Sequence, residues 1–95
     1  MERSKLKKLR QQIDILRRRG GIKSRDLEAI AKALGRKVGP SGKHPMWVTD
    51  RAGSRPISIP HHTVDLNRFT AQRILDQLEA DIDEIEGYHD EENDG

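Results

Sequence analysis

The chain contains no cysteine, which excludes a disulfide framework, a thiol nucleophile and any zinc site with cysteine ligands. It has no apolar run near the roughly 18 residues that a membrane span needs, and its basic N-terminus lacks the apolar core of a secretory signal. Aromatic residues are scarce, with one Trp, one Tyr and one Phe in 95 residues. That length holds one small hydrophobic core. We therefore expect a single-domain, soluble, cytoplasmic protein that makes no membrane contact.

Charge is abundant in the chain and unevenly distributed. Charged residues make up 36% of the sequence against 33% for hydrophobic ones. Residues 1–55 hold 16 Lys and Arg against 5 Asp and Glu, whereas residues 56–95 hold 2 against 11. This asymmetry favours a polyanion-binding face beside an acidic segment that either lies elsewhere or partly masks it. The alternative is an ordinary solvated surface, and charge alone does not choose between the two.

The first segment, Glu2 to Arg19, has the period of an amphipathic helix that ends at Gly20. Its apolar residues form one stripe: Leu6, Leu9, Ile13 and Leu16. The stripe is too short for a stable isolated coiled coil, so we expect it to pack on the body of the protein, on a second copy or on a partner. The basic residues beside it, such as the run 17–19, either contact nucleic acid or keep the helix soluble.

The middle of the chain predicts a second helix followed by three short strands. The helix runs from about Arg25 to Leu34, with Ser24 as its N-cap and Gly35 at its end. The strands are expected at residues 37–38, 44–49 and 57–59. Turns rich in Gly, Pro and Ser separate them, and the apolar residues within them alternate.

A last helix is predicted from about Thr70 to Glu86. Its apolar residues share one face: Ile74, Leu75, Leu78, Ile82 and Ile85. A short turn before it is expected to bury Leu66 and Phe69, and Gly87 ends the periodic pattern. Residues 87–95 are acidic and aperiodic, which predicts a disordered tail.

The order helix, helix, three strands, helix indicates an α+β fold. We expect a two-layer sandwich in which a three-stranded antiparallel sheet carries helices on one face. The chain then divides into a basic helical extension over residues 1–20, an α-β-β-β-α body over residues 21–86 and the acidic tail over residues 87–95.

Three histidines near the strands are candidates for acid–base chemistry, because an unperturbed imidazole titrates near pH ~6.5. His44 follows a glycine and Lys43 at the mouth of the second strand, where a phosphate can approach the backbone and meet positive charge. His61 and His62 are adjacent, so their side chains point apart on an extended segment and chelate a metal poorly. No metal site is predicted. A purely structural role for these histidines stays open at this point.

Three stretches of the sequence, taken together and in this order, resemble the HicA toxins of bacterial HicA–HicB toxin–antitoxin systems. They are RDLEAIAKALG at 25–35, GKHPMWV at 42–48, and ISIPHH at 57–62 continuing through DL at 65–66 to TAQRILDQL at 70–78. The second stretch is similar to the family's Gly-Ser-His followed by an aromatic strand residue, with Lys43 in place of the Ser. Phe69 stands where a Gly normally precedes the Thr.

The resemblance implies a fold similar to the double-stranded RNA-binding domain and an endonuclease that cleaves messenger RNA without a metal or another cofactor. By the same resemblance, His44 occupies the position of the family's catalytic histidine. A HicB-like antitoxin that covers the site is the implied protein partner. The first helix lies outside the family's short form and is a candidate for self-association.

RNA carries its own nucleophile, the 2′-hydroxyl, so the protein needs only to position the strand, neutralise charge and move protons. We expect His44 to act as general base, and His62 or water to protonate the leaving oxygen. The residues expected to contact RNA are Arg36, Lys37, Lys43 and Trp47. Trp47 either stacks on an unpaired base or lies in the core under the last helix. The alternative function is a non-catalytic RNA-binding or protein-interaction module on the same fold.

Overall fold

The structure is a computed structural model that describes residues 3–39, 45–51, 53–61 and 65–93 of the chain. Its elements follow the predicted order, and the fold class is α+β as predicted. The helices are α1 (Arg3–Arg18), α2 (Ser24–Ala33) and α3 (Arg68–Asn93), and the strands are β1 (Lys37–Val38), β2 (Met46–Val48) and β3 (Ile57–Ser58). No helix within these residues is both long enough and apolar enough to cross a membrane.

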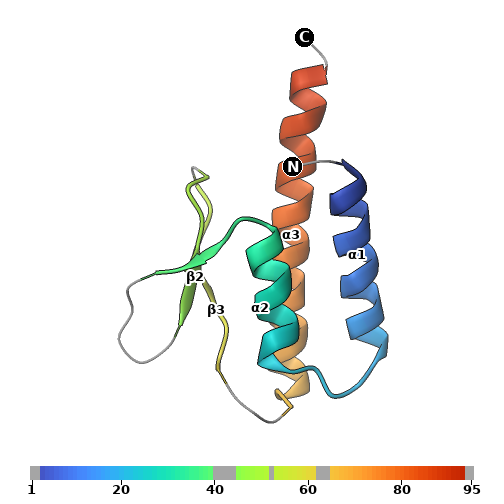
Figure 1. The fold of residues 1–95 in the computed structure, drawn as a ribbon, viewed down its shortest axis with the longest axis vertical. Coiled ribbons are helices and arrows are strands. Elements are labelled where there is room, and N and C mark those ends of the chain that lie inside the picture. The colour runs from blue at the N-terminus through green and yellow to red at the C-terminus, as the bar shows by residue number, and fades with distance from the viewer. Residues whose placement is uncertain (1–2, 40–44, 52, 62–64, 94–95) are drawn as a thin grey trace.

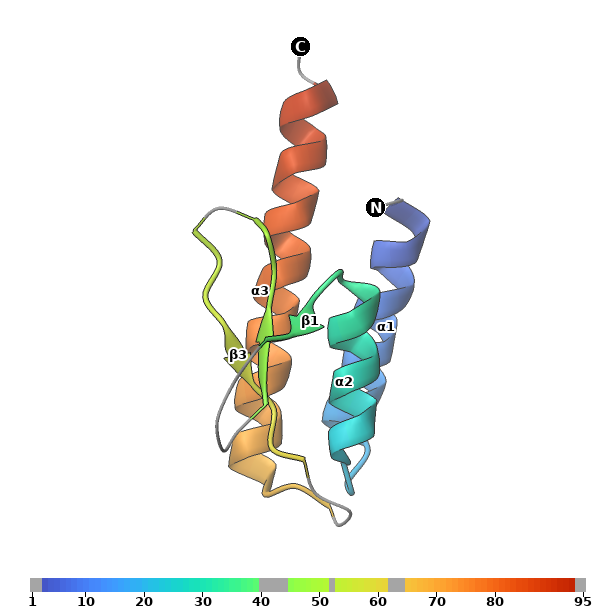
Figure 2. The same cartoon turned by 60° about the vertical axis from the view of Figure 1, so that its left-hand side comes forward.

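The three strands form one antiparallel sheet in the order β1-β2-β3. Trp47 lies at its centre, paired with Val38 on one side and with Ile57 on the other. Because side chains alternate along a strand, Trp47 and Ile57 are buried against the helices while Val48 faces solvent. Figure 1 and Figure 2 show the sheet on one side of the long helix α3.

Helix α1 is part of the hydrophobic core. It runs antiparallel to α3 and lies beside it, on the side away from the sheet (Figure 1). All four residues of its apolar stripe are at most 6% exposed. The sequence allowed the stripe to pack on the body of the protein, on a second copy or on a partner, and the structure shows it packed on the body of the protein. The stripe itself is thus buried within the protein, and self-association through another face of the first helix stays a prediction.

Helix α2 begins one residue earlier than predicted, and its cap is different. Lys23 is the N-cap, and its backbone N–H donates to the carboxylate of Asp26 at 3.0 Å. Ser24, the predicted cap, is instead buried, and its hydroxyl donates to the carbonyl oxygen of Pro60. Ser24 therefore ties the start of α2 to the segment that follows β3.

Helix α3 starts earlier than predicted, and the turn before it does not bury Phe69. The side chain of Asn67 accepts a hydrogen bond from the backbone N–H of Phe69 at 2.9 Å, which begins the helix at Arg68. Leu66 is half-buried, but Phe69 is 88% exposed. The prediction that the turn buries both side chains is therefore wrong for Phe69.

The C-terminal end of α3 also differs from the prediction. The helix continues through Gly87 to Asn93, so the predicted stop at Gly87 is wrong. The reason is energetic, because a single glycine weakens a helix by about 1 kcal/mol relative to Ala but keeps its backbone hydrogen bond. That is too little to end a helix that packing already holds. The disorder of the acidic tail over residues 87–95 stays a prediction.

Candidate functional site

The described residues that flank the candidate catalytic histidines in sequence, at the start of β2 and the end of β3, lie at the same end of the sheet. Lys43, His44 and His62 lie outside the described residues, so the structure describes their flanks. The N–H of Gly39 donates to the carbonyl oxygen of Met46 at 2.8 Å and closes the connection from β1 to β2. At the next step of the ladder, the N–H of Ile59 donates to the carbonyl oxygen of Pro45 at 3.3 Å. The start of β2 and the end of β3 are therefore neighbours.

The segment that follows β3 is held along the beginning of α2. Besides the bond from Ser24 to Pro60, the N–H of Leu66 donates to the carbonyl oxygen of Ile22 at 2.8 Å. His61 lies between these two anchors; its side chain is 74% exposed, and Nδ1 is 3.6 Å from a carboxylate oxygen of Glu28. This imidazole is open to solvent, with one carboxylate beside it.

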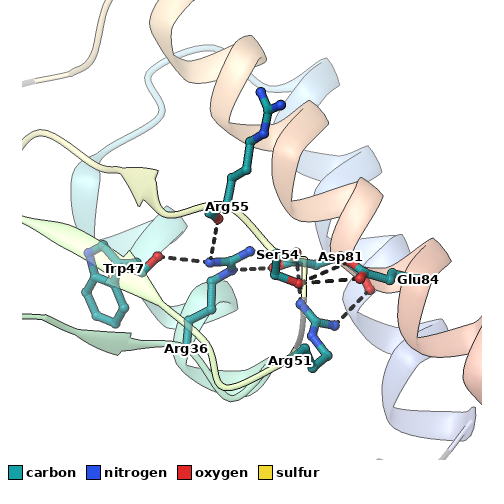
Figure 3. A network of polar contacts seen from close by, with 7 residues as sticks. All are labelled: Arg36, Trp47, Arg51, Ser54, Arg55, Asp81 and Glu84. Atoms are coloured by element: carbon teal, nitrogen blue, oxygen red, sulfur yellow. Dashed lines mark hydrogen bonds and ion pairs between the residues drawn. The ribbon is translucent and has the colours of Figure 1, made fainter.

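Arg36 is predicted to contact RNA, but the structure places it in the interior. It is 3% exposed, and its Nε and Nη2 both donate to the carboxylate of Asp81 on α3, the latter at 2.7 Å. Its Nη1 donates to the carbonyl oxygens of Trp47 and Arg55, at 2.9 and 3.1 Å (Figure 3). With every guanidinium nitrogen bonded inside the protein, Arg36 has no nitrogen left for a phosphate.

A second arginine completes this interior cluster. Arg51 lies with its Nη2 2.9 Å from Oδ1 of Asp81 (Figure 3). At the exposed edge of the cluster, the hydroxyl of Ser54 lies 3.3 Å from the carboxylate of Glu84. The cluster joins the residue before β1, the middle strand and the β2–β3 connection to one side of α3. Its role is to fix the sheet on the helix.

The sequence allows Trp47 either to stack on an RNA base or to lie in the core, and the structure shows it in the core. The side chain is among the largest fully buried groups, at 2% exposure, so neither face of the indole is open to an RNA base. Lys37 is exposed on β1, where it can still make a solvent-facing contact. Of the four residues predicted to contact RNA, Arg36 and Trp47 are therefore structural, Lys37 is exposed, and Lys43 lies outside the described residues.

Some of the basic residues of the N-terminal half form ion pairs with acidic residues of the C-terminal half, between α1 and α3. Arg10 contacts the carboxylates of Asp83 and Glu86, the latter at 3.0 Å. Since these two carboxylates accept its hydrogen bonds, the pKa of Arg10 is raised above its ordinary value. Arg17 lies 2.7 Å from Asp76. The acidic helix thus masks part of the basic one, which is one of the two alternatives that the sequence allows.

A cleft that sequence reasoning did not identify lies where α1 ends and α3 begins. It has a volume of about 230 Å³ and is lined by Arg17, Arg18, Arg19, Gly20, Gly21, Ile22, Leu66, Arg68, Ala71 and Gln72. We call it the arginine cleft. Arg17 and Arg19 are engaged with carboxylates, whereas Arg18 and Arg68 are exposed and take part in no ion pair among the residues described. Within the residues described, neither of these two guanidinium groups lies within ion-pair distance of a carboxylate, although the carboxylate of Asp65 lies against Gly21 at the edge of the cleft.

Comparison of the chain with models of protein families, with curated proteins and with solved structures finds no match. The described part of the chain also holds no group of three or more His, Asp or Glu side chains arranged to bind a metal ion. The function must therefore be argued from the residues and their arrangement.

Proposed function

We propose that this protein is an endoribonuclease of the HicA type, which cuts messenger RNA with histidine acid–base catalysis. The observation that carries the proposal is the hydrogen bond between Ile59 and Pro45. It joins the start of β2, which closely follows His44 in sequence, to the end of β3, which precedes His61 and His62. Histidines far apart in the sequence thus belong to segments that meet at one end of the sheet.

Two further observations support the proposal. The α-β-β-β-α order of residues 24–93, with an antiparallel sheet in the order β1-β2-β3, is what the resemblance implies. The residues on either side of His61 and His62 are anchored as well: Pro60 is bonded to Ser24 at the start of α2, and Leu66 to Ile22 just before that helix. These two hydrogen bonds fix the described residues on either side of positions 62–64 to the rest of the fold.

The chemistry needs two proton transfers. His44 takes the proton of the ribose 2′-hydroxyl, and the resulting oxyanion attacks the adjacent phosphorus atom. The bond from phosphorus to the 5′-oxygen breaks, and His62 or a water molecule gives that oxygen a proton. The products are a 2′,3′-cyclic phosphate and a 5′-hydroxyl. A well-placed base contributes about 10²–10⁴-fold to such a reaction, and Lys43 would offset the negative charge that builds on the phosphate oxygens.

The experiment compares the wild-type protein with His44→Ala on a labelled RNA in buffer containing EDTA. We expect wild-type protein to cut the RNA and leave a cyclic phosphate end, and the variant to lose at least about 10²-fold in rate. Circular dichroism and thermal melting of the variant should match the wild type. Full cleavage by His44→Ala would overturn the assignment.

The same assay separates this function from a non-catalytic RNA-binding module. A binding module shifts the RNA in a gel and leaves it intact, whereas the proposed enzyme turns it over. The resemblance also proposes a HicB-like antitoxin as partner, so a protein encoded beside this chain should stop cleavage when it is added in equal amount. If the wild-type protein does not cleave RNA, the proposed enzymatic function fails. If it cleaves RNA and the neighbouring protein does not stop the cleavage, the proposed partner fails.

A further inference from the structure

The most exposed large apolar side chain among the described residues is Phe69, in the first turn of α3. It is 88% exposed, although it is the only phenylalanine in a chain with few aromatic residues. With Arg68 and Gln72 it lines a shallow hollow. Arg68 and Gln72 also line the arginine cleft, so the hollow and the cleft form one continuous surface.

The charge of this surface is opposite to what the helix alone would favour. The N-terminal end of a helix carries partial positive charge, so acidic residues stabilise a first turn and basic residues weaken it. Helix α3 has no acidic residue in its first turn and begins with Arg68. Arg18, at the C-terminal end of α1, adds a second cation to the same cleft. An anion bound here would pair with both guanidinium groups, beside a helix end whose first turn is capped by the side chain of Asn67.

The surface is linked to the proposed catalytic site by the backbone. The segment from Ile59 to Leu66 is bonded to Pro45 at one end and to Ile22, a lining residue of the cleft, at the other. The turn from α1 to α2 and the first turn of α3 lie at the same end of the molecule (Figure 1 and Figure 2). The described ends of this segment thus lie beside the start of β2 and beside the arginine cleft.

We propose that the arginine cleft and Phe69 bind a single-stranded part of the RNA substrate that flanks the cleaved bond. Phosphates contact Arg18 and Arg68, and one unpaired base stacks on the ring of Phe69. An exposed aromatic beside a cationic groove is the arrangement that single-stranded nucleic acid requires, because every base has a face that can stack. The inference rests on the proposed function for the identity of its ligand and for the position of the cut.

The test is fluorescence anisotropy with a labelled oligonucleotide of about a dozen nucleotides, with every 2′-hydroxyl methylated so that it cannot be cut. Phe69→Ala should weaken binding about tenfold, because no ring is left for the base to stack on. Arg68→Glu should weaken it further and lower the slope of log affinity against log salt by about 0.7 for each phosphate that is no longer bound. A blunt duplex of the same sequence should be insensitive to Phe69→Ala, since its bases are already stacked within the helix.

Two variants serve as controls. Ile15→Ala removes another exposed apolar side chain, on α1 and outside the cleft. Lys32→Glu makes a reversal of charge like that of Arg68→Glu, in the last turn of α2. Both should bind the oligonucleotide within about twofold of the wild type at moderate salt, because neither residue binds a phosphate and the salt slope should not change. All four side chains are exposed, so all four variants should melt with the wild type.

The outcomes separate this inference from the proposed function. If Phe69→Ala and Arg68→Glu bind like the controls, the surface does not bind RNA, whatever the wild type cleaves. If they weaken binding but the wild type cuts no RNA, the surface stands and the endonuclease proposal fails. Equal weakening for the single strand and the duplex would overturn the stacking role of Phe69.

Discussion

Two groups of arginines in this protein have different roles, although nothing close to them in the sequence distinguishes one group from the other. Arg36 and Arg51 meet at the carboxylate of Asp81, in the interior between the sheet and α3. Arg18 and Arg68 lie on the surface where α1 ends and α3 begins. The two groups differ in how many of their guanidinium N–H groups are hydrogen-bonded to acceptors within the protein. Every guanidinium nitrogen of Arg36 is bonded to a protein acceptor, whereas Arg18 and Arg68 have no carboxylate partner within the residues described.

The comparison shows where positive charge is available to a ligand. An arginine whose nitrogens are all bonded inside the fold stabilises the structure, and a phosphate would have to displace its partners. An exposed arginine contributes little to folding, since surface ion pairs are worth about 0–1 kcal/mol, and its donors stay open to a ligand. Removing one partner of a buried pair costs far more, because the other charge is left without compensation.

The largest expected effect is that of Asp81→Asn. This change leaves Arg36 buried beside a neutral amide, and we expect a loss of about 3–5 kcal/mol in the free energy of unfolding. Urea denaturation followed by circular dichroism measures it. Asp76→Asn is the matched control, because Asp76 is 68% exposed and pairs with Arg17 at the surface, so its loss should stay below about 1 kcal/mol.

The same two variants can also contradict the distinction between buried and exposed arginines. If Asp81→Asn unfolds at the urea concentration of the wild type, the interior cluster does not depend on its ion pair. Arg36 would then be held in the interior mainly by its hydrogen bonds to the carbonyl oxygens of Trp47 and Arg55. If instead both variants lose several kcal/mol, the surface pairs of α1 and α3 belong with the interior group.

The next effect in size compares two isoleucines on α1. Ile13 is fully buried in the core, whereas Ile15, two residues further, is 59% exposed. Ile13→Ala should cost about 2–5 kcal/mol, because it removes packed atoms and leaves a cavity. Ile15→Ala should change stability by no more than about 0.5 kcal/mol. Equal and small effects would show that α1 is an appendage rather than part of the core.

The order of elements was predictable from the sequence because the signals for it are local. Apolar residues spaced three and four apart predict α1, and alternation about Trp47 predicts the central strand. The end of α3 was not predictable in the same way. Gly87 weakens a helix locally, but the helix before it is held by the packing of Ile82 and Ile85 on residues far away in the sequence, and one glycine is too little to end it.

The roles of individual site residues were less predictable, because each depends on a distant partner. Nothing near Arg36 in the sequence indicates that it pairs with Asp81, 45 residues later. The arginine cleft combines residues 17–22 with residues 66–72, and no short motif spans that separation. Phe69 had a local signal in Asn67, a good N-cap residue, which starts the helix early. The catalytic assignment of His44 stays a prediction from the resemblance, and that of His62, or water in its place, stays a prediction from the chemistry of RNA cleavage.

The smallest expected effect is that of Arg10→Gln, and its dependence on salt sharpens the comparison. Arg10 is one third exposed, and its partners Asp83 and Glu86 are more exposed still. We expect a loss of at most about 1 kcal/mol at low salt, measured by urea denaturation. At about 1 M NaCl the loss should nearly vanish, because the screening length falls to about 3 Å. Lys8→Gln, an exposed position on the same helix, is the control.

The loss caused by Asp81→Asn should persist at the same high salt, because a pair that is 2% and 5% exposed is screened far less. The two arginine groups would then differ in their response to salt as well as in the size of the effect. A loss in Arg10→Gln that did not diminish with salt would mean that the contacts between α1 and α3 act as interior contacts. The carboxylates of α3 would then stay paired with the arginines of α1 at any salt concentration. A polyanion could contact α1 at the arginine cleft, where Arg18 has no carboxylate partner among the residues described.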